Sequence, residues 1–321
     1  MALRIGLRAL LLGAILLAGG AAADDFDFEV GLTYDRTQLD SEQTFTSNVG
    51  TIFNATEVDT DAYGLFGSWY FAGLSDDNGP RARAAFVDRA SMLSVGYVRT
   101  DVTFSTSIVS TDPLVPPFEG EFESDGDAYA LDLRYVWRDS GWFMNAGVAE
   151  ADANVGGTIG GSSDATAWRL GVGKYLFDTT TLALDVSETD DDVADATVVA
   201  LAFAHLGDMG ETWQYGVDLG YARTDGDFDL EIDSWNAALS LYPNRDVEFG
   251  LRIVEQDADP EFLESTSYEG FASWFVTPSV VLGASYRVDD VDSRGSVAFQ
   301  PADRDSDTDQ DGFSLSVSVR F

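Results

Sequence analysis

The chain has 321 residues, with 56 acidic against 18 basic side chains, a net charge of −38 and no cysteine. Such an acidic surface excludes nucleic acid and other polyanions as partners, and without disulfides any rigidity must come from backbone pairing. Divalent cations, cationic solutes or a saline medium suit this charge.

Residues 1–23 predict a cleaved secretory signal peptide. Arg4 and Arg8 precede an apolar stretch over 9–18, and small residues follow it. A charged start, a short apolar middle and a small-residue exit are the three parts of such a leader, and the apolar stretch is too short to span a bilayer. We expect the mature chain, 24–321, to form one domain. No later stretch approaches the length of a helical span.

From Asp24 onward, apolar residues recur with a period of two in short runs separated by Gly, Asp, Asn and Pro, which predicts an all-β protein. In 127–138, for example, Tyr129 and Leu131 alternate with Ala130 and Asp132. The expected strands are roughly 25–38, 61–72, 91–104, 127–138, 142–154, 165–177, 180–189, 196–206, 212–224, 230–242, 246–256, 267–276, 279–290 and 312–321.

An even count lets the last strand pair with the first, so the pattern predicts a transmembrane antiparallel up-and-down β-barrel, most simply of 14 strands, with 12 or 16 left open. Trp and Tyr gather at both ends of the strands, as in the aromatic girdles of membrane barrels, which favours this fold over a secreted β-sandwich or solenoid. The girdle residues are Trp69, Trp137, Trp142, Trp213 and Trp274 at one end, and Tyr34, Tyr97, Tyr221, Trp168 and Trp235 at the other.

The connections between strands alternate in length. Those at 138–141, 178–180, 207–211, 243–246 and 277–279 are short, whereas 39–60, 105–126, 257–266 and 291–311 are long and mostly acidic. In outer-membrane barrels the short turns are periplasmic. We therefore expect both termini to be periplasmic and the protein to lie in the outer membrane of a Gram-negative bacterium, in contact with lipid and lipopolysaccharide.

Segment 73–90 breaks this rule, because it is long but lies on the short-turn side. Its "PRARAAFVDRA" predicts a short helix beginning near Pro80. The sequence leaves open whether this segment enters the lumen.

The C-terminal stretch "GFSLSVSVRF" alternates apolar residues with serines up to the last residue. It resembles the insertion signal of Gram-negative outer-membrane barrels. The resemblance implies that Val317, Val319 and Phe321 are read by the barrel assembly machinery.

Gly79-Pro80 and the following "AAFVDRAS" at 84–91 resemble a pattern in the porin family of gammaproteobacterial outer membranes. The resemblance implies a water-filled diffusion channel for small hydrophilic solutes, without catalytic residues. The single histidine, His205, is predicted on the lipid-facing side near a strand end, where no Ser–His–Asp arrangement is expected, so the sequence indicates no enzyme. Two alternatives remain: a structural or adhesive barrel with a closed lumen, and a substrate-specific channel.

The face opposite the apolar one carries mixed charge in nearly every strand. Mixed charge implies water inside the barrel and a transverse field that selects solutes by charge, although paired networks bracing the wall would look the same. With an acidic external rim, the sequence predicts cation preference. The predicted pore-lining residues are Asp27, Glu29, Asp132, Arg134, Arg169, Asp185, Asp218, Glu248, Arg252 and Arg287.

Two acidic loops suggest further roles. Loop 105–126, with Glu119, Glu121 and Glu123, is similar to the loop that folds inward to narrow general porins; the alternative is a solvated surface loop. In the last loop, Asp305, Asp307, Asp309 and Asp311 match from Asp307 the D-x-D-x-D-G opening of a calcium loop. Ser318 stands where an EF-hand needs Glu, which leaves a weak Ca²⁺ site of roughly 10⁻⁴–10⁻³ M or a solvated loop. No other cofactor is expected.

Overall fold

The computed structural model describes residues 25–47, 50–75, 79–111, 116–155, 161–191, 195–227, 230–259, 264–292 and 303–321. The predicted signal peptide, 1–23, lies outside these ranges. Within them, no helix has the length and apolar character needed to cross a bilayer.

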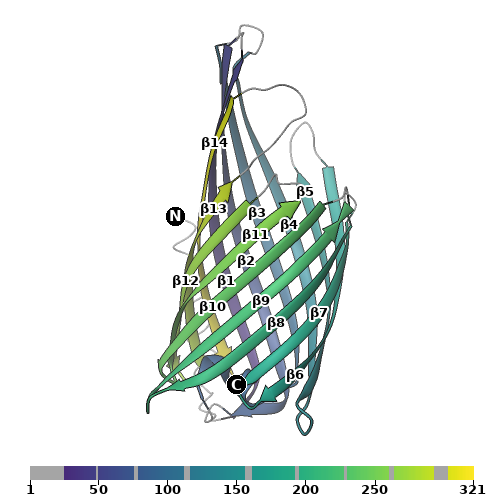
Figure 1. The fold of residues 1–321 in the computed structure, drawn as a ribbon, viewed down its shortest axis with the longest axis vertical. Helices are drawn as coiled ribbons and strands as arrows, with labels where there is room; N and C mark the ends of the chain where they lie inside the picture. Colours follow the sequence, from purple (N-terminus) through teal and green to yellow (C-terminus); the bar gives the residue numbers. More distant parts are fainter. Residues whose placement is uncertain are drawn as a thin grey trace.

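Fourteen strands and one short helical segment make up the described chain (Figure 1). The strands are β1 (Asp25–Ser47), β2 (Gly50–Ser75), β3 (Met92–Ser110), β4 (Phe118–Trp137), β5 (Trp142–Val155), β6 (Gly161–Phe177), β7 (Thr180–Asp191), β8 (Ala196–Met209), β9 (Trp213–Gly226), β10 (Leu230–Asn244), β11 (Val247–Asp259), β12 (Glu264–Thr277), β13 (Val280–Asp292) and β14 (Asp303–Arg320). Between β2 and β3 lie the 3₁₀ turn η2 (Arg81–Arg83) and the helix α2 (Ala84–Val87).

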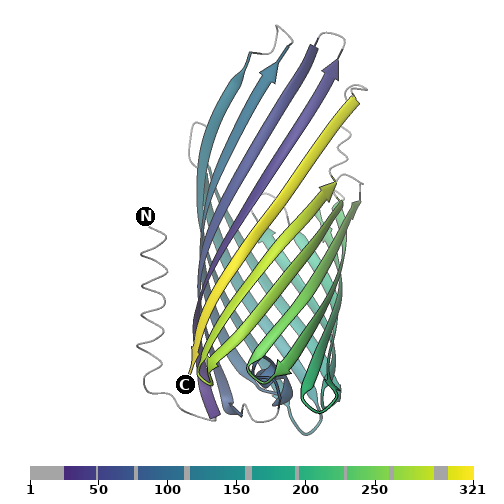
Figure 2. The same ribbon diagram turned by 90° about the vertical axis from the view of Figure 1, so that its left-hand side faces the viewer.

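Every strand pairs antiparallel with its sequence neighbours, and β1 pairs with β14, so the sheet is a closed barrel. The first and last strands match from Glu29 with Arg320 to Thr46 with Asp303. The predicted 14-strand antiparallel barrel, closed by its terminal strands, is therefore confirmed. We call the end with the tight connections and the C-terminus the turn end, and the opposite end the loop end (Figure 2).

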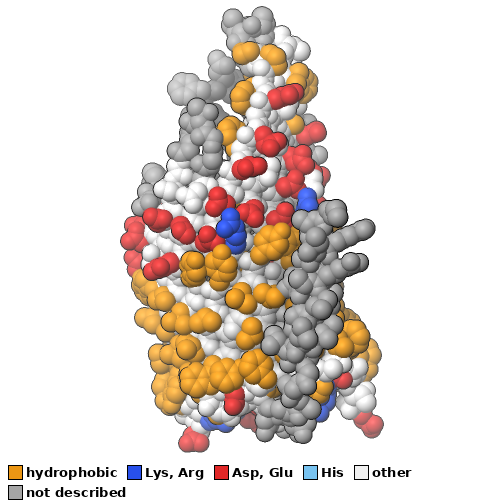
Figure 3. Space-filling model, turned by 180° about the vertical axis from the view of Figure 1, so that it is seen from behind, with side chains coloured by type: hydrophobic (Ala, Val, Ile, Leu, Met, Phe, Trp, Pro, Cys, Tyr) orange, Lys and Arg blue, Asp and Glu red, His pale blue; other side chains and the backbone are white. Residues whose placement is uncertain are grey.

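The apolar face of the strands forms the outside of the barrel. Large apolar side chains there are well exposed, among them Leu131, Leu170, Leu251 and Trp274. On the side of the barrel that Figure 3 shows, hydrophobic side chains form a band over the turn-end part of the wall, with acidic side chains above it. An exposed apolar band bounded by charge is the surface that a bilayer covers in barrels of this kind.

Five strands continue beyond the rest at the loop end, where the sequence predicted loops (Figure 2). β1 reaches Ser47 and β2 begins at Gly50, so the predicted loop 39–60 is almost wholly strand. Likewise β3 runs to Ser110, β4 begins at Phe118 and β14 begins at Asp303. With 26 residues, β2 is about 85 Å long at ~3.3 Å per residue. We call the projecting parts of β1, β2, β3, β4 and β14 the tall sheet.

The tall sheet was missed because its apolar residues are sparse and mostly share the inward-facing side, not the lipid-facing one. Its outer face is mostly Asp, Glu, Ser and Thr, and on its inner face apolar residues such as the row Leu39, Val58, Phe104 and Phe122 are separated by Thr, Ser and Asn, so the hydrophobic period that marks a half-buried strand is interrupted. Threonine is nevertheless a good strand residue, and antiparallel backbone pairing holds the sheet together with both faces wet.

Phe26 of β1 faces the inside of the barrel, although the predicted alternation places it outside with Phe28. The register shifts between Phe26 and Phe28. As a result Phe28 stays outside, whereas Phe26 is buried among Tyr70, Leu74 and Ala84. A β-bulge of this kind re-aims one side chain at the edge of a barrel.

Candidate functional site

The lumen wall follows from strand alternation. Exposed apolar residues such as Leu131 and Leu251 mark the outward-facing positions of their strands, and the strand registers extend this assignment round the barrel. Because successive residues of a strand point to opposite sides, the residues between the outward-facing ones face the lumen; we call these two sets outward and inward parity. Nine of the ten sequence-predicted pore-lining residues have inward parity: Glu29, Asp132, Arg134, Arg169, Asp185, Asp218, Glu248, Arg252 and Arg287. Asp27 instead lies at the bulge of β1, exposed at the turn end.

Most inward arginines are paired with a carboxylate, on a neighbouring strand, on the next strand but one or on the same strand. Arg320 Nε lies 2.9 Å from Glu29 Oε2, across the junction of β14 and β1. The other wall pairs are Arg169 with Asp132 at 2.6 Å, Arg252 with Glu269 at 2.7 Å and Arg287 with Asp289 at 3.0 Å. These pairs fix the charges to the wall, and most remain partly exposed to the interior, as expected for a wet lumen.

The segment between β2 and β3 enters the lumen at the turn end, which answers the question that the sequence left open. We call residues 79–91 the plug. It carries η2 and α2, which lie at the turn end of the barrel (Figures 1 and 2). Its Ala84 and Ala90 are buried against Phe26, Tyr70 and Leu74. Pro80 precedes η2, as the sequence indicated.

The plug reaches the opposite wall. β9 and β10 lie seven strands from β2 and β3, half-way round the ring, and fourteen strands spaced ~4.8 Å and tilted ~40° enclose a backbone diameter of about 28 Å. Arg83 donates Nε to Tyr242 Oη at 2.8 Å and Nη1 to Asp218 Oδ1 at 3.2 Å, and its Nη2 pairs with Asp218 Oδ2. The plug therefore spans the turn-end mouth.

Burial alone would lower the pKa of Arg83, but its bonds to Asp218 and Tyr242 outweigh burial and raise that pKa above its ordinary value. The guanidinium therefore stays charged at any physiological pH. It holds the far end of the plug as a permanent cation bound to β9 and β10.

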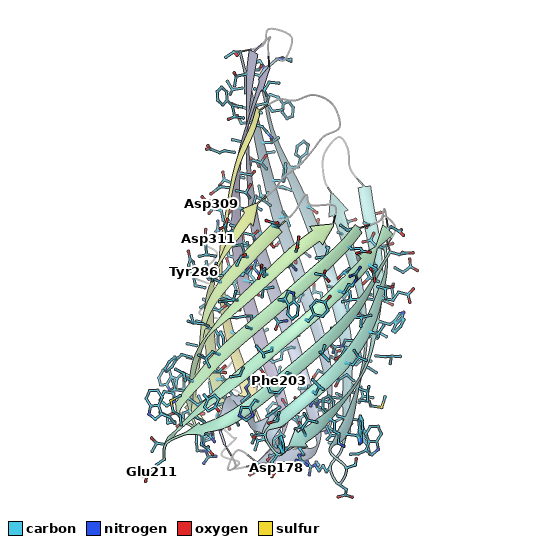
Figure 4. The ribbon with its side chains drawn as sticks, in the orientation of Figure 1. Asp178, Phe203, Glu211, Tyr286, Asp309 and Asp311 are labelled. Carbon is cyan, nitrogen blue, oxygen red and sulfur yellow. The ribbon has the colours of Figure 1, made fainter. Side chains whose placement is uncertain are left out.

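Further bonds hold the plug around the rest of the ring. Arg81 pairs with Asp246, and its carbonyl accepts Arg320 Nη1 at 3.0 Å. Tyr175 Oη donates to the Phe86 carbonyl at 3.1 Å. Arg89 Nη2 lies 2.7 Å from Asp178 Oδ1, in the β6–β7 turn that Figure 4 labels at the turn end. The plug is thus bonded to β6, β9, β10, β14 and two turns.

Above the plug lies a chamber of about 530 Å³. Its floor includes Arg83, Ala85 and Phe86 of the plug, and its wall comes from β3, β4, β5, β7, β8, β9 and β10. One part of that wall is alanine, at Ala183, Ala200, Ala202, Ala204 and Ala222. Its polar groups are Arg134, Asn145, Thr181, Asp185, Asp218 and Asn236.

The three glutamates predicted in an inward-folding loop belong to a strand instead. Glu119, Glu121 and Glu123 lie in β4, opposite Ser107, Ser105 and Thr103 of β3. They share the parity of Tyr129 and Leu131, so they face outward in the tall sheet. The loop boundaries 105–126 were therefore wrong, and these carboxylates lie away from the lumen arginines.

The aspartates predicted as a calcium loop also lie in a strand, β14, which pairs with β1 up to Asp303. Side chains on one face of a strand are about 6.6 Å apart along it, so they do not wrap round one ion as a loop does. Asp309 and Asp311 lie in the loop-end half of the wall (Figure 4), where Asp311 Oδ2 accepts a bond from Tyr286 at 3.3 Å. The side chains of Asp305 and Asp307 lie outside the described ones, among which no group of three acidic or metal-ligating residues converges on a possible ion site.

Carboxylates and tyrosines meet on the outer face just beyond the apolar band. In three places a tyrosine donates its hydroxyl to an aspartate of the next strand, and an arginine two residues after that tyrosine lies close by. The pairs are Tyr34 with Asp61 at 2.5 Å, Tyr97 with Asp127 at 2.5 Å and Tyr221 with Asp233 at 2.6 Å. The loop-end rim of the band is therefore strongly acidic, with its tyrosines fixed in orientation.

The C-terminal residue is bonded into the barrel. Phe321 donates its backbone N–H to the Phe28 carbonyl at 2.9 Å, and its carbonyl accepts from Asp27 and Phe28 at 3.1 and 2.9 Å. The rings of Phe321 and Phe28 stack with centroids 5.9 Å apart. Val317 and Val319 precede it on the outward parity of β14, opposite Leu32 and Val30.

His205 has outward parity on β8. Its Nδ1 lies 2.8 Å from Thr180 Oγ1 and its ring packs against Tyr215. No carboxylate pairs with it in the described part of the chain. The predicted place of His205, on the lipid-facing side near a strand end, agrees with this position.

No protein-family model matches the sequence, and no curated protein matches it. Among solved structures, the outer membrane protein Omp33 of Acinetobacter baumannii aligns with a TM-score of 0.52 at 17% identity, over 92% of this chain and 99% of Omp33. The KdgM porin aligns with a TM-score of 0.39 at 11% identity, over 62% of this chain and 95% of KdgM. OprB of Pseudomonas putida aligns with a TM-score of 0.40 at 9% identity, over 91% of this chain and 92% of OprB. The likeness to Omp33 shows the fold: this chain is an outer-membrane type of β-barrel.

Sequence reasoning missed the plug contacts. Arg83 and Asp218 are 135 residues apart, and Tyr242 was counted only as part of a strand. The one available signal was the length of the segment after β2, with three arginines at a place where short turns are the rule.

Proposed function

We propose that the chain is an outer-membrane channel for small hydrophilic solutes, closed at one mouth by the plug in the conformation described. The observation that carries the proposal is the chamber above the plug, a space of about 530 Å³ inside a closed barrel whose lining includes charged and amide side chains. A lumen lined by charged pairs holds water rather than a dry core. Solutes would enter from the loop end and leave when the plug is displaced.

The same proposal places the barrel in the outer membrane of a Gram-negative bacterium, with both termini and the plug on the periplasmic side. In outer-membrane barrels the short turns face the periplasm, and the plug lies at that end. Residues 1–23 would direct export, and Phe321 with Val317 and Val319 would be read by the assembly machinery. Lipid and lipopolysaccharide would surround the apolar band.

We also propose that the channel prefers cations. The net charge of −38 and the acidic rim beyond the apolar band favour cations at the outer mouth. The wall pairs inside are close to neutral, so the preference would come from the rim and fall as salt screens it.

A second candidate is a structural barrel whose lumen stays closed. The bonds between the plug and six parts of the ring favour it, because such an anchored segment would open rarely. Single-channel recording in a planar bilayer separates the two. Discrete conductance steps of the wild-type protein support the channel, whereas a silent bilayer with verified insertion supports the structural barrel.

A further inference from the structure

Arg134 differs from the other inward arginines of the wall. Arg169, Arg252, Arg287 and Arg320 each have a carboxylate within 3.0 Å. Arg134 has none within 4 Å in the described chain; it stacks over the Phe143 ring at 4.1 Å and donates Nη2 to Tyr175 Oη at 3.3 Å. Its charge is therefore oriented by neutral groups and left available at the chamber wall.

Asp185 is the matching anion. It lies in the same row of the wall, because Arg134 pairs with Asn145, Asn145 with Gly171 and Gly171 with Asp185. Asn145 Nδ2 donates to Asp185 Oδ1 at 3.4 Å, and no described lysine or arginine lies within 4 Å of the carboxylate. Two opposite charges thus face one chamber without neutralising each other.

Two glycines of β6 leave room for the Asp185 carboxylate and for the Phe143 ring on which Arg134 stacks. A side chain at Gly171 would collide with the Asp185 carboxylate, and one at Gly173 would collide with the Phe143 ring. Glycine at these two positions therefore lets Asp185 approach from β7 and the Phe143–Arg134 stack approach from β4 and β5. The cation and the anion converge on one strip of the chamber wall.

We propose that the chamber above the plug binds a small zwitterionic solute of amino-acid or dipeptide size. Its carboxylate would bind the Arg134 guanidinium, its ammonium group would bind Asp185, and its body would lie along Ala183, Ala200 and Ala202. An isolated cation or anion would satisfy only one of the two groups, whereas a zwitterion satisfies both. This inference rests on the proposed channel only for its biological purpose; the binding itself needs no conduction.

The test is calorimetric titration of the folded, detergent-solubilised barrel with three probes of one shape. L-Leucine carries both charges, 4-methylpentanoate lacks the ammonium group and 3-methylbutylamine lacks the carboxylate. We expect leucine to bind, and each analogue to bind at least about tenfold more weakly, since a hydrogen bond to a charged group contributes ~1.5–3 kcal/mol. Equal binding of all three, or none of leucine, would overturn the proposal.

Variants of Arg134 and Asp185 test whether these two side chains bind the charged groups of leucine. Arg134→Gln and Asp185→Asn should each weaken leucine binding at least tenfold, while Arg252→Gln, which removes an arginine already paired with Glu269, should leave it unchanged. Heat-modifiable migration on a gel verifies that each variant is folded. If Arg252→Gln weakens leucine binding as much as Arg134→Gln does, binding depends on the overall electric field of the lumen, and the assignment of Arg134 as the carboxylate-binding group is wrong.

The inference and the proposed function can fail separately. Conductance steps without leucine binding would refute the zwitterion site and leave the channel standing. Leucine binding in a protein that never conducts would support the site and refute the channel.

Discussion

Replacing Arg83 by Gln should loosen the plug. This change removes the cation from the contact between the plug and the far wall that joins β9 and β10 at once, to Asp218 and Tyr242. Gln keeps a polar group of similar reach but no charge. The expected outcome is a higher probability of the open state with an unchanged barrel.

The magnitude follows from the exposure of the pair. A fully buried pair broken on one side costs about 3–5 kcal/mol, and an exposed one at most about 1 kcal/mol. The Arg83 side chain is 21% exposed and that of Asp218 34%, so we take about 2 kcal/mol. Since 1.4 kcal/mol is a factor of ten, the ratio of open to closed states should rise about 30-fold.

Single-channel recording of wild type, Arg83→Gln and Arg252→Gln measures this ratio. The Arg252–Glu269 pair joins β11 to β12 and does not touch the plug, so its loss should leave the open probability near that of wild type. Asp218→Asn added to Arg83→Gln should have little further effect, because both changes break one interaction. An open probability that stays at the wild-type value in Arg83→Gln would refute the role of the plug as a gate.

Three further predictions follow from other parts of the barrel. Deleting Phe321 removes three backbone bonds that close β14 on β1 and should reduce the amount of inserted protein, measured as heat-modifiable protein in outer-membrane fractions; wild-type levels would contradict this. A reversal potential across a KCl gradient should indicate cation preference at low salt that fades as ionic strength rises, and anion selectivity would refute the role of the acidic rim. Deleting 110–123 shortens the tall sheet at β3 and β4 without touching the lumen arginines, so conductance should not change; an increase would mean that Glu119, Glu121 and Glu123 do narrow the pore.

The barrel could be predicted because a bilayer requires an apolar outer face. Because of that requirement, every second residue of a strand is apolar, as in Tyr129, Leu131 and Tyr135 of β4. The residues between them then face the lumen. The parity of Asp132, Arg134 and Arg169 followed from this alternation. Where the bilayer ends the requirement ends too, so the tall sheet, wet on both faces, was read as loops.

Local irregularity and long-range contacts limited the rest. The bulge that turns Phe26 inward depends on packing against Tyr70 and Leu74, which the residues around Phe26 do not reveal. The pairing of Arg83 with Asp218 joins segments on opposite walls, and the charges of Arg134 and Asp185 become a site only when three registers align them in one row. Such information lies in the closed barrel, not in any one strand.

The most direct test of the central claim is solute flux through the barrel in liposomes. Proteoliposomes holding the wild-type protein or Arg83→Gln are placed in isotonic solutions of leucine and of sugars of increasing size, and their swelling is recorded. We expect small solutes to enter, faster with Arg83→Gln than with the wild-type protein, and solutes above a size limit to be excluded. Proteoliposomes of both proteins that swell no faster than protein-free vesicles would show that the barrel is not a channel.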